Sequence, residues 1–488
     1  MEHLIRPGYK PEQISDRLRF DNPWWSTGKV DPYYGAMSPR MYLDEFYSHI
    51  SDAELHRGVI LMGPRRVGKT VLLFHTIQRL LENGVNPHKI IYISIETPIY
   101  SCIALEELFS IAREAVGAQG TGENFYVFFD EIQYLKDWEV HLKSLVDSFR
   151  TCKFTASGSA AAALKMKSDE SGAGLFTDFY LPPLAFCEYL QLKDLTNIVV
   201  PSKETLCGEE APFFHSVNLS ELNRHFIDYL NFGGYPEVVL SERIRSNPAQ
   251  FIRNDIIDKV LLRDLPSLYG ISDVQELNAF FSVIAYHSGN EVSYEGLAQL
   301  SGVKKETLHK YLEYLQAAFL LKTLYKTDRS ARHFQRVTAF KVYLTNPSLR
   351  CALFQPLFPT DEKIGSLVET AVLSQRLPRS GAPVYYSNWK EGKTSGEVDM
   401  VGLNPATQKP QWAAEIKWTN RFYERPGELK SLRQFMGANK LQWALVTTLD
   451  AAGVREVDGK KFQCIPTALY AYALGYNTLM RKDSEIGL

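Results

Sequence analysis

The sequence predicts an α/β protein of several domains, with a mainly parallel sheet in its first half. Three observations predict this class. Short apolar runs alternate with helical stretches between residues 58 and 185, a pattern typical of buried parallel strands covered by helices. A glycine-rich turn joins the first run to its helix, and a second set of short apolar runs follows residue 349. At 488 residues, the chain is too long for one hydrophobic core, so about three domains are expected.

Composition excludes some classes of protein. The 54 basic and 56 acidic residues leave a net charge of -2, so any nucleic-acid-binding face must be local. The six cysteines form no CxxC pair, which favours reduced thiols. The N-terminus has no signal-peptide pattern, and no apolar run approaches the ~20 residues that span a bilayer. We therefore expect a cytoplasmic protein that does not contact membranes.

The first segment, residues 1–50, is rich in Pro, Trp and Tyr. We expect an irregular N-terminal arm that packs its aromatic side chains on the next domain. Basic residues are not interleaved among these aromatics, so stacking on nucleic-acid bases is disfavoured. The next segment, 51–215, holds the apolar runs GVILMG, KIIYISIE, FYVFFDEI and KFTASGS, which we expect to be the strands of an α/β sandwich.

The turn GPRRVGKT, residues 63–70, fits the pattern G-x-x-x-x-G-K-[ST] between a strand and an amphipathic helix. Its glycines let backbone N–H groups turn inward around a phosphate, and the helix N-terminus adds partial positive charge. Lys69 would reach the β- and γ-phosphates, and the Thr70 hydroxyl would ligate Mg²⁺. The expected nucleotide contacts are Gly63, Pro64, Arg65, Arg66, Val67, Gly68, Lys69, Thr70 and Val71. We expect ATP and Mg²⁺ as ligands.

About sixty residues later, an apolar run leads into Asp130 and Glu131. Asp130 can hold the magnesium shell, and Glu131 can orient and deprotonate a water for in-line attack. A strand-end cap is the alternative for these two residues alone. In TASGS, Ser157 or Ser159 could place a hydroxyl near the γ-phosphate, although a serine cap of a turn explains the same letters.

Residues 216–288 are expected to be a helical lid or connector, and residues 289–348 a winged helix-turn-helix. The second of its two amphipathic helices and the segment after it are both basic, which suits duplex DNA phosphates. Docking of a protein partner, or a merely solvated helix face, is the alternative. The basic residues concerned are Lys304, Lys305, Lys310, Arg329, Arg332 and Arg336.

Residues 349–488 read as another α/β domain, with a helix at 365–377, strands at 383–390, 396–404, 412–418 and 442–448, and a helix at 427–437. Glu369 lies on its first helix, whereas Asp399, Glu415 and Lys417 lie at or near the ends of consecutive strands. Adjacent strands would bring these carboxylates together as oxygen ligands for Mg²⁺. Lys417 could then stabilise developing charge, and Glu397 could substitute in part. A surface ion-pair cluster on a sheet edge is the alternative.

Five motifs in this order, GPRRVGKT, FFDEIQ, TASGS, DFYLPPLAFCEYL and GGYPEVVL, resemble a bacterial and archaeal family of AAA-type ATPases. Members of that family carry a C-terminal domain similar to the PD-(D/E)XK nucleases. The resemblance implies an AAA+-like P-loop core at 51–215, then the helical and winged-helix segments, and a nuclease-like domain at 349–488. It assigns Lys69 and Thr70 to Walker A, and Asp130 and Glu131 to Walker B.

The same resemblance assigns the nuclease-type set to Glu369, Asp399, Glu415 and Lys417. The chain departs from the family at Leu175, where an arginine is frequent, so no arginine finger is assigned there; Arg150 and Arg243 are available. AAA+ proteins favour homo-oligomeric rings, and a monomer is left open.

Three functions follow. The first is a Mg-dependent ATPase whose nucleotide state controls a DNA-contacting or nuclease-like effector. The second is an active metal-dependent endonuclease in defence against foreign DNA. The third is a slow nucleotide switch that binds a protein partner without nuclease activity.

Overall fold

The structure is a computed structural model that describes residues 9–52, 54, 56–101, 103–118, 123–159, 174–330, 339–376, 383–391 and 394–480. The chain divides into two compact units, Met1–Pro182 (unit 1) and Pro183–Leu488 (unit 2). Residues 183–215, which the sequence interpretation grouped with the P-loop core, therefore pack with unit 2. Within the described ranges, no helix combines the length and the apolar character needed to cross a membrane.

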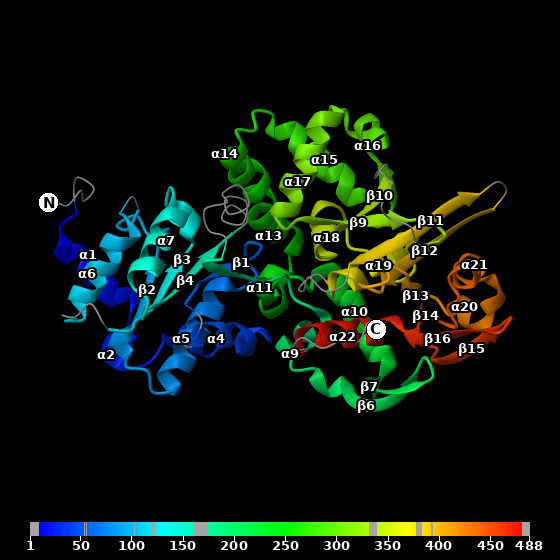
Figure 1. The fold of residues 1–488 in the computed structure, drawn as a ribbon, viewed down its shortest axis with the longest axis horizontal. Coiled ribbons are helices and arrows are strands. Elements are labelled where there is room, and N and C mark those ends of the chain that lie inside the picture. Colours follow the sequence, from blue (N-terminus) through cyan, green and yellow to red (C-terminus); the bar gives the residue numbers. More distant parts are fainter. Residues whose placement is uncertain are drawn as a thin grey trace. The chain divides into compact units, whose positions relative to one another are not determined.

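Unit 1 is built on a five-stranded parallel sheet with the order β2-β3-β4-β1-β5. Its strands are β1 (Gly58–Met62), β2 (Ile90–Ser94), β3 (Tyr126–Asp130), β4 (Lys153–Gly158) and β5 (Phe176–Tyr180). Its helices are α1 (Pro11–Asp21), α2 (Trp24–Thr27), α3 (Pro32–Gly35), α4 (Leu43–Ser51), α5 (Lys69–Glu82), α6 (Leu105–Ala115) and α7 (Trp138–Ser148), with short 3-10 turns at Pro87–Lys89 and Ile132–Tyr134 (Figure 1). β1 to β4 confirm the four predicted strands.

The described part of the N-terminal arm, from residue 9, contains the four helices α1 to α4 and is therefore less irregular than expected. Its aromatic side chains do pack on the sheet. The indole N–H groups of Trp24 and Trp25 both donate to the carbonyl oxygen of Ile90 on β2, at 3.0 and 2.8 Å. The buried Asn22 side chain bonds both the N–H and the C=O of Tyr92. The arm is thus tied to the backbone of an edge strand, whose outer polar groups need partners.

Unit 2 contains a nine-stranded mixed sheet with the order β15-β16-β14-β13-β12-β11-β9-β10-β8. A separate antiparallel hairpin consists of β6 (Val199–Leu206) and β7 (Glu209–Ser216). The strands of the large sheet are β8 (Glu291–Ser293), β9 (Leu321–Thr327), β10 (Ala339–Leu344), β11 (Val384–Glu391), β12 (Thr394–Leu403), β13 (Pro410–Glu415), β14 (Trp443–Thr448), β15 (Gly453–Val457) and β16 (Lys460–Pro466).

The helices of unit 2 cover both the hairpin and the sheet (Figure 1). They are α9 (Phe186–Leu192), α10 (Leu219–Phe232), α11 (Pro236–Leu240), α12 (Glu242–Arg245), α13 (Pro248–Ile252), α14 (Leu265–Tyr269), α15 (Val274–Tyr286), α16 (Tyr294–Ser301), α17 (Lys305–Ala317), α18 (Ser348–Leu353), α19 (Ile364–Ser374), α20 (Arg421–Glu424), α21 (Lys430–Asn439) and α22 (Thr467–Met480). Two π-helical turns, Arg253–Asp258 and Val260–Asp264, lie between α13 and α14, and 3-10 turns occur at Thr196–Ile198 and Pro426–Glu428.

The strands at 289–348 and 383–466 belong to one sheet, although the sequence placed them in two domains. β9 pairs in parallel with β11, with Tyr325 opposite Tyr385. The two amphipathic helices expected at 289–348 are α16 and α17, which β9 and β10 follow. A winged helix-turn-helix and its role in DNA binding stay predictions. The junction places side chains of β10 and β12 in one site.

Candidate functional sites

The turn after β1 has the backbone that a phosphate loop requires. A Cβ atom at Gly63 would lie 2.2 Å from the carbonyl oxygen of Leu181, so only glycine fits there. Arg66 and Gly68 both have positive φ values, 65° and 94°, and helix α5 begins directly afterwards. Of the other expected contacts, Pro64 and Val67 are buried, Arg65, Thr70 and Val71 are half-buried, and Arg66 is exposed.

Lys69 lies along this loop. Its side chain is buried, and its ammonium group donates to the carbonyl oxygens of Gly63 at 3.2 Å and Pro64 at 2.9 Å. Helix α5 begins at Lys69, directly after the loop. The first N–H groups of a helix have no partner within the helix, so those of α5 are available at the loop. Positive charge and N–H donors therefore meet at the carboxyl end of β1, as phosphate binding requires.

Asp130, at the end of β3, accepts hydrogen bonds from three hydroxyl groups. Thr70 and Tyr92 each donate to Oδ2 at 2.8 Å, and Ser157 donates to Oδ1. The carboxylate is only 2% exposed, and no described Lys, Arg or His forms an ion pair with it. Burial, and next the charge of Glu131, raise its pKa. A buried carboxylate beside a hydroxyl and without a cation fits a Mg²⁺ ligand set.

Glu131 follows in a left-handed conformation, with φ 54°. Its backbone N–H donates to the Ser157 hydroxyl at 3.1 Å, and its carboxylate accepts from the Gln133 amide. The carbonyl oxygen of the same amide accepts from the Ser159 N–H at 3.3 Å. The two serines thus differ: Ser157 holds Asp130 and Glu131, whereas the Ser159 hydroxyl is buried with no hydrogen-bond partner among the described residues.

Arg40, in the loop before α4, has no counterpart in the sequence analysis. Its buried guanidinium group donates to the carbonyl oxygens of Val67 at 2.6 Å and Pro182 at 3.0 Å, and lies 5.4 Å from the centre of the Tyr42 ring. It therefore joins the phosphate loop to the chain that follows β5. No local pattern announces such a contact, because 27 residues separate Arg40 from the loop carbonyl.

A second cluster of charges lies in unit 2, where β12 and β13 pair antiparallel. Lys417 bridges two carboxylates, at 2.8 Å from Asp399 and 2.7 Å from Glu415. Asp399 also accepts from the backbone N–H of Ile416 at 2.9 Å. Asp399 and Glu415 are each 6% exposed and lie on interior strands of the sheet. The alternative of a surface ion-pair cluster on a sheet edge is therefore wrong.

Lys341 on β10 completes this cluster, and the sequence analysis did not identify it. Its ammonium group lies 2.9 Å from Glu369, 2.7 Å from Glu397 and 3.9 Å from Asp399. Its side chain is 2% exposed. Tyr343, two residues along the same face of β10, donates to Glu369 as well. Thus the four expected nuclease-type residues do lie in one cluster, but Lys341 joins its two halves.

The charges in this cluster shift one another's protonation. Burial, and next the charge of Asp399, raise the pKa values of Glu369 and Glu415. Burial alone would raise the pKa of Asp399, but the ammonium groups of Lys417 and Lys341 lower it to about 2. Within the described ranges, no three His, Cys, Asp or Glu side chains are arranged to hold a metal ion. The expected Mg²⁺ set of the C-terminal domain does not fit this geometry.

The described basic residues proposed for DNA contact in the winged-helix segment differ in exposure, and Arg329 is half-buried. Lys304, Lys305 and Lys310 are exposed, and Lys305 pairs with Glu295 on α16. The backbone carbonyl of Arg329 accepts from Asn439 on α21 at 2.9 Å. Arg332 and Arg336 lie outside the described residues. DNA contact by this segment stays a prediction.

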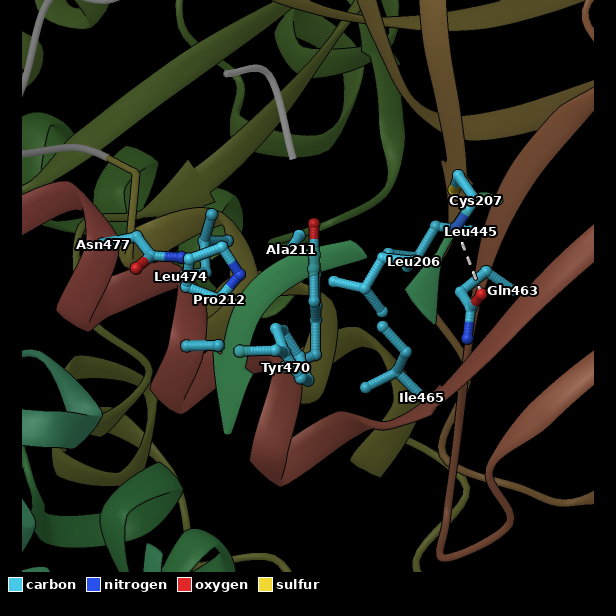
Figure 2. Close-up of a pocket in the computed structure, with 12 residues that line it drawn as sticks. Leu206, Cys207, Ala211, Pro212, Leu445, Gln463, Ile465, Tyr470, Leu474 and Asn477 are labelled. Carbon is cyan, nitrogen blue, oxygen red and sulfur yellow. Dashed lines mark hydrogen bonds between the residues drawn. The ribbon is translucent and has the colours of Figure 1, made fainter. Parts of the chain in front are cut away.

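Unit 2 also contains an apolar cavity of about 270 Å³ between the β6–β7 hairpin, α22 and the sheet. Figure 2 shows Tyr470 and Leu474 of α22 facing Ala211 and Pro212 of the hairpin. The backbone N–H of Cys207 donates to the Gln463 side chain at 3.3 Å, which fixes the hairpin tip. The lining has no Asp, Glu, Lys, Arg or His, so it offers no charged group for catalysis.

Comparisons with known proteins agree with the site in unit 1. Residues 56–190 match the AAA domain family, and residues 223–360 match a domain of unknown function, DUF8612. An uncharacterized protein of Methanocaldococcus jannaschii is 27% identical over 54% of this chain and 55% of its own length. The match thus spans little more than half of that relative. An uncharacterized protein of Haemophilus influenzae is 24% identical over 60% of this chain and 68% of its own.

Among solved structures, C. elegans PCH-2 aligns with 49% of this chain and 67% of its own, at 15% identity and a TM-score of 0.26. Replication initiator DnaA bound to AMPPCP and single-stranded DNA aligns with 64% and 93%, at 13% identity and a TM-score of 0.26. Scores this low do not establish a shared fold. Residues 56–190, which contain the phosphate loop and Asp130, are thus similar to the AAA domain family, and residues 223–360 to a domain of unknown function.

Proposed function

We propose that the protein binds and hydrolyses ATP in unit 1 in a Mg²⁺-dependent reaction. One observation supports this most: the Thr70 hydroxyl and the Asp130 carboxylate lie 2.8 Å apart below the glycine turn, and Asp130 is buried without a described cationic partner. A hydrated divalent cation would supply the missing charge there. The match to the AAA domain family supports the same activity.

The roles of the side chains follow from their positions. Lys69 would turn from the loop carbonyls towards the β- and γ-phosphates and offset their charge. Thr70 and Asp130 would hold Mg²⁺, which supplies positive charge to the phosphate oxygens when bound. Glu131 would accept a proton from the attacking water. Of the two candidate serines, Ser159 is the better γ-phosphate contact, because its hydroxyl has no described partner.

Two substitutions test this assignment. Lys69→Ala should lose nucleotide binding, because it removes the buried loop ammonium group that would offset the charge of the β- and γ-phosphates. Glu131→Gln should still bind ATP but lower turnover by about 100-fold or more, the range in which positioned acid–base groups contribute. Nucleotide binding and phosphate release are measured in parallel, with Lys29→Ala and Glu12→Gln as exposed controls in the same unit. ATP turnover by Lys69→Ala at the parental rate would rule out this site.

We propose further that the nucleotide state of unit 1 controls what unit 2 binds. The exposed lysines of α17 support duplex DNA as the ligand, and a protein partner is the alternative. ATP turnover with and without duplex DNA separates these two. Stimulation that Lys304→Ala together with Lys310→Ala abolishes would support DNA. Slow turnover, retained nucleotide and no DNA binding would support a switch that recruits a protein.

A further inference from the structure

The carboxylate cluster of unit 2 differs from the nucleotide site in how its charge is balanced. Among the described residues, the hydrogen-bond partners of the Asp130 carboxylate in unit 1 are hydroxyl groups. In the unit 2 cluster, by contrast, Glu369, Asp399 and Glu415 each contact an ammonium group, from Lys341 or Lys417. Both sites contain carboxylates, which suit Mg²⁺. In unit 2 the lysines already neutralise these carboxylates, whereas the negative charge of Asp130 in unit 1 has no described cationic partner.

Lys341 lies where the carboxylates of two elements converge. It contacts Glu369 from α19 and both Glu397 and Asp399 from β12. A divalent ion shared by Glu369 and Asp399 would need the same carboxylate oxygens, because Mg²⁺ binds oxygen at about 2.0–2.1 Å. It would then lie in contact distance of an ammonium group, in a buried region where like charges repel strongly.

Lys341 cannot easily leave this position. It is an interior residue of β10, which pairs on one side with β9 and on the other with β8, and its side chain is 2% exposed. The ring of Tyr386 lies 5.5 Å from its ammonium group, and Tyr343 shares Glu369 with it. Moving the ammonium group away would leave Glu369 without its lysine partner and Asp399 with Lys417 alone, which is costly for carboxylates with little solvent exposure.

We infer that Lys341 takes the place of a divalent cation in this cluster, so that unit 2 holds its nuclease-like carboxylates as a metal-free, lysine-neutralised site. The cluster then stabilises the junction between β10, β12 and α19 and does not cleave DNA by a metal-dependent route. Removing the ammonium group should convert the same carboxylates into a site for a hard divalent cation.

The experiment is a titration of the full chain with Mn²⁺. The electron paramagnetic resonance signal of free Mn²⁺ measures how much of the ion is bound. Asp130→Asn serves as the background, because it removes the carboxylate expected to hold metal in unit 1. In this background we expect the cluster of unit 2 to bind no Mn²⁺. A further Asp399→Asn substitution should therefore leave the amount of bound Mn²⁺ unchanged. Lys341→Met should gain one Mn²⁺ equivalent, and Asp399→Asn should abolish that gain.

Thermal unfolding provides a second measurement. Lys341→Met should lower the unfolding midpoint of unit 2, and Mn²⁺ should restore it in a dose-dependent way. Lys326→Met is the matched control, because Lys326 lies on the neighbouring strand β9 and pairs with one carboxylate, Glu291, at 3.5 Å. It should neither gain a Mn²⁺ equivalent nor respond to the ion.

Two results would overturn the inference. One is Mn²⁺ binding in the Asp130→Asn background that Asp399→Asn removes, since the ion would then coexist with Lys341. The other is a folded Lys341→Met variant that gains no Mn²⁺. If Lys341→Met does not fold with or without Mn²⁺, the first measurement still decides, because it needs no change at Lys341. Mg²⁺-dependent DNA cleavage that Asp399→Asn abolishes would contradict the inference as well.

Discussion

Arg40 is a single buried side chain outside the glycine-turn motif that hydrogen-bonds the backbone of the phosphate loop. Its two hydrogen bonds fix the carbonyl of Val67 and the carbonyl of Pro182. Hydrogen bonds to a charged group contribute about 1.5–3 kcal/mol each. The loop conformation, with its two positive φ angles, therefore depends on a residue outside the motif.

We predict that Arg40→Gln weakens ATP binding by roughly 10- to 100-fold, the effect of about 1.4–2.8 kcal/mol. The reason is that the loop must then be ordered by the nucleotide itself. Binding is measured by calorimetry, with Arg57→Gln, an exposed arginine beside β1, as the control. Equal affinities in the two folded variants would show that Arg40 does not order the loop.

Sequence patterns reveal some site residues and conceal others. Lys69 and Thr70 follow from the spacing of the glycine turn, and Asp130 from its place after four apolar residues. Lys341 lies among apolar residues in a strand, where a lysine is usually expected to point into solvent from one face of the sheet. Its partners Glu369 and Glu397 are distant in the chain, so their contact depends on sheet order, which local patterns do not encode.

At the scale of elements, continuous apolar runs predict interior strands well. β1 to β4 and β11 to β14 were expected from such runs, and all of them except the edge strand β2 are interior strands. The strands that were missed are β5, β8, β15, β16 and the β6–β7 hairpin. β5 and β15 lie at sheet edges and mix exposed and half-buried residues, which obscures the apolar run. The unexpected parallel pairing of β9 with β11 cannot be inferred from either strand alone.

The pairing of β12 and β13 gives a pH dependence that can be measured. Burial alone would raise the pKa of Asp399, but Lys417 and Lys341 lower it to about 2, below the value of about 3.9 in an unfolded chain. A carboxyl group with a lowered folded-state pKa contributes stability above the unfolded-state value and loses it as pH falls towards the folded-state value. The contribution of Asp399 is therefore lost between about pH 4 and pH 2.

We expect the free energy of unfolding of unit 2 to fall by about 1 kcal/mol more in the parent than in Asp399→Asn between pH 5 and pH 3. Denaturant unfolding at each pH measures the two slopes. The comparison concerns the slopes only, because Asp399→Asn is expected to be less stable at every pH. Parallel curves would mean that Asp399 is not paired in the folded protein.

At the scale of the whole molecule, two compact units should give separable unfolding transitions. Saturating Mg-ATP analogue should stabilise unit 1 by about 2.7 kcal/mol at 100 times the dissociation constant. Differential scanning calorimetry should therefore show one transition moving to higher temperature, and Lys69→Ala should abolish the shift. An equal shift in Lys69→Ala would place the nucleotide elsewhere. If the nucleotide analogue also shifts the transition of unit 2 in the parent but not in Lys69→Ala, the size of that shift measures the coupling between the two units.

The continuous sheet of unit 2 also limits how the chain can be cut. A fragment that starts at residue 349, the boundary which the sequence suggests, would lack β8, β9 and β10. It would expose the open side of β11, whose free backbone groups invite pairing with other copies. It would also lose Lys341 and leave Glu369 and Asp399 to repel each other. The excised C-terminal piece would thus self-associate more readily, and its carboxylate cluster would carry negative charge that Lys341 offsets in the intact chain.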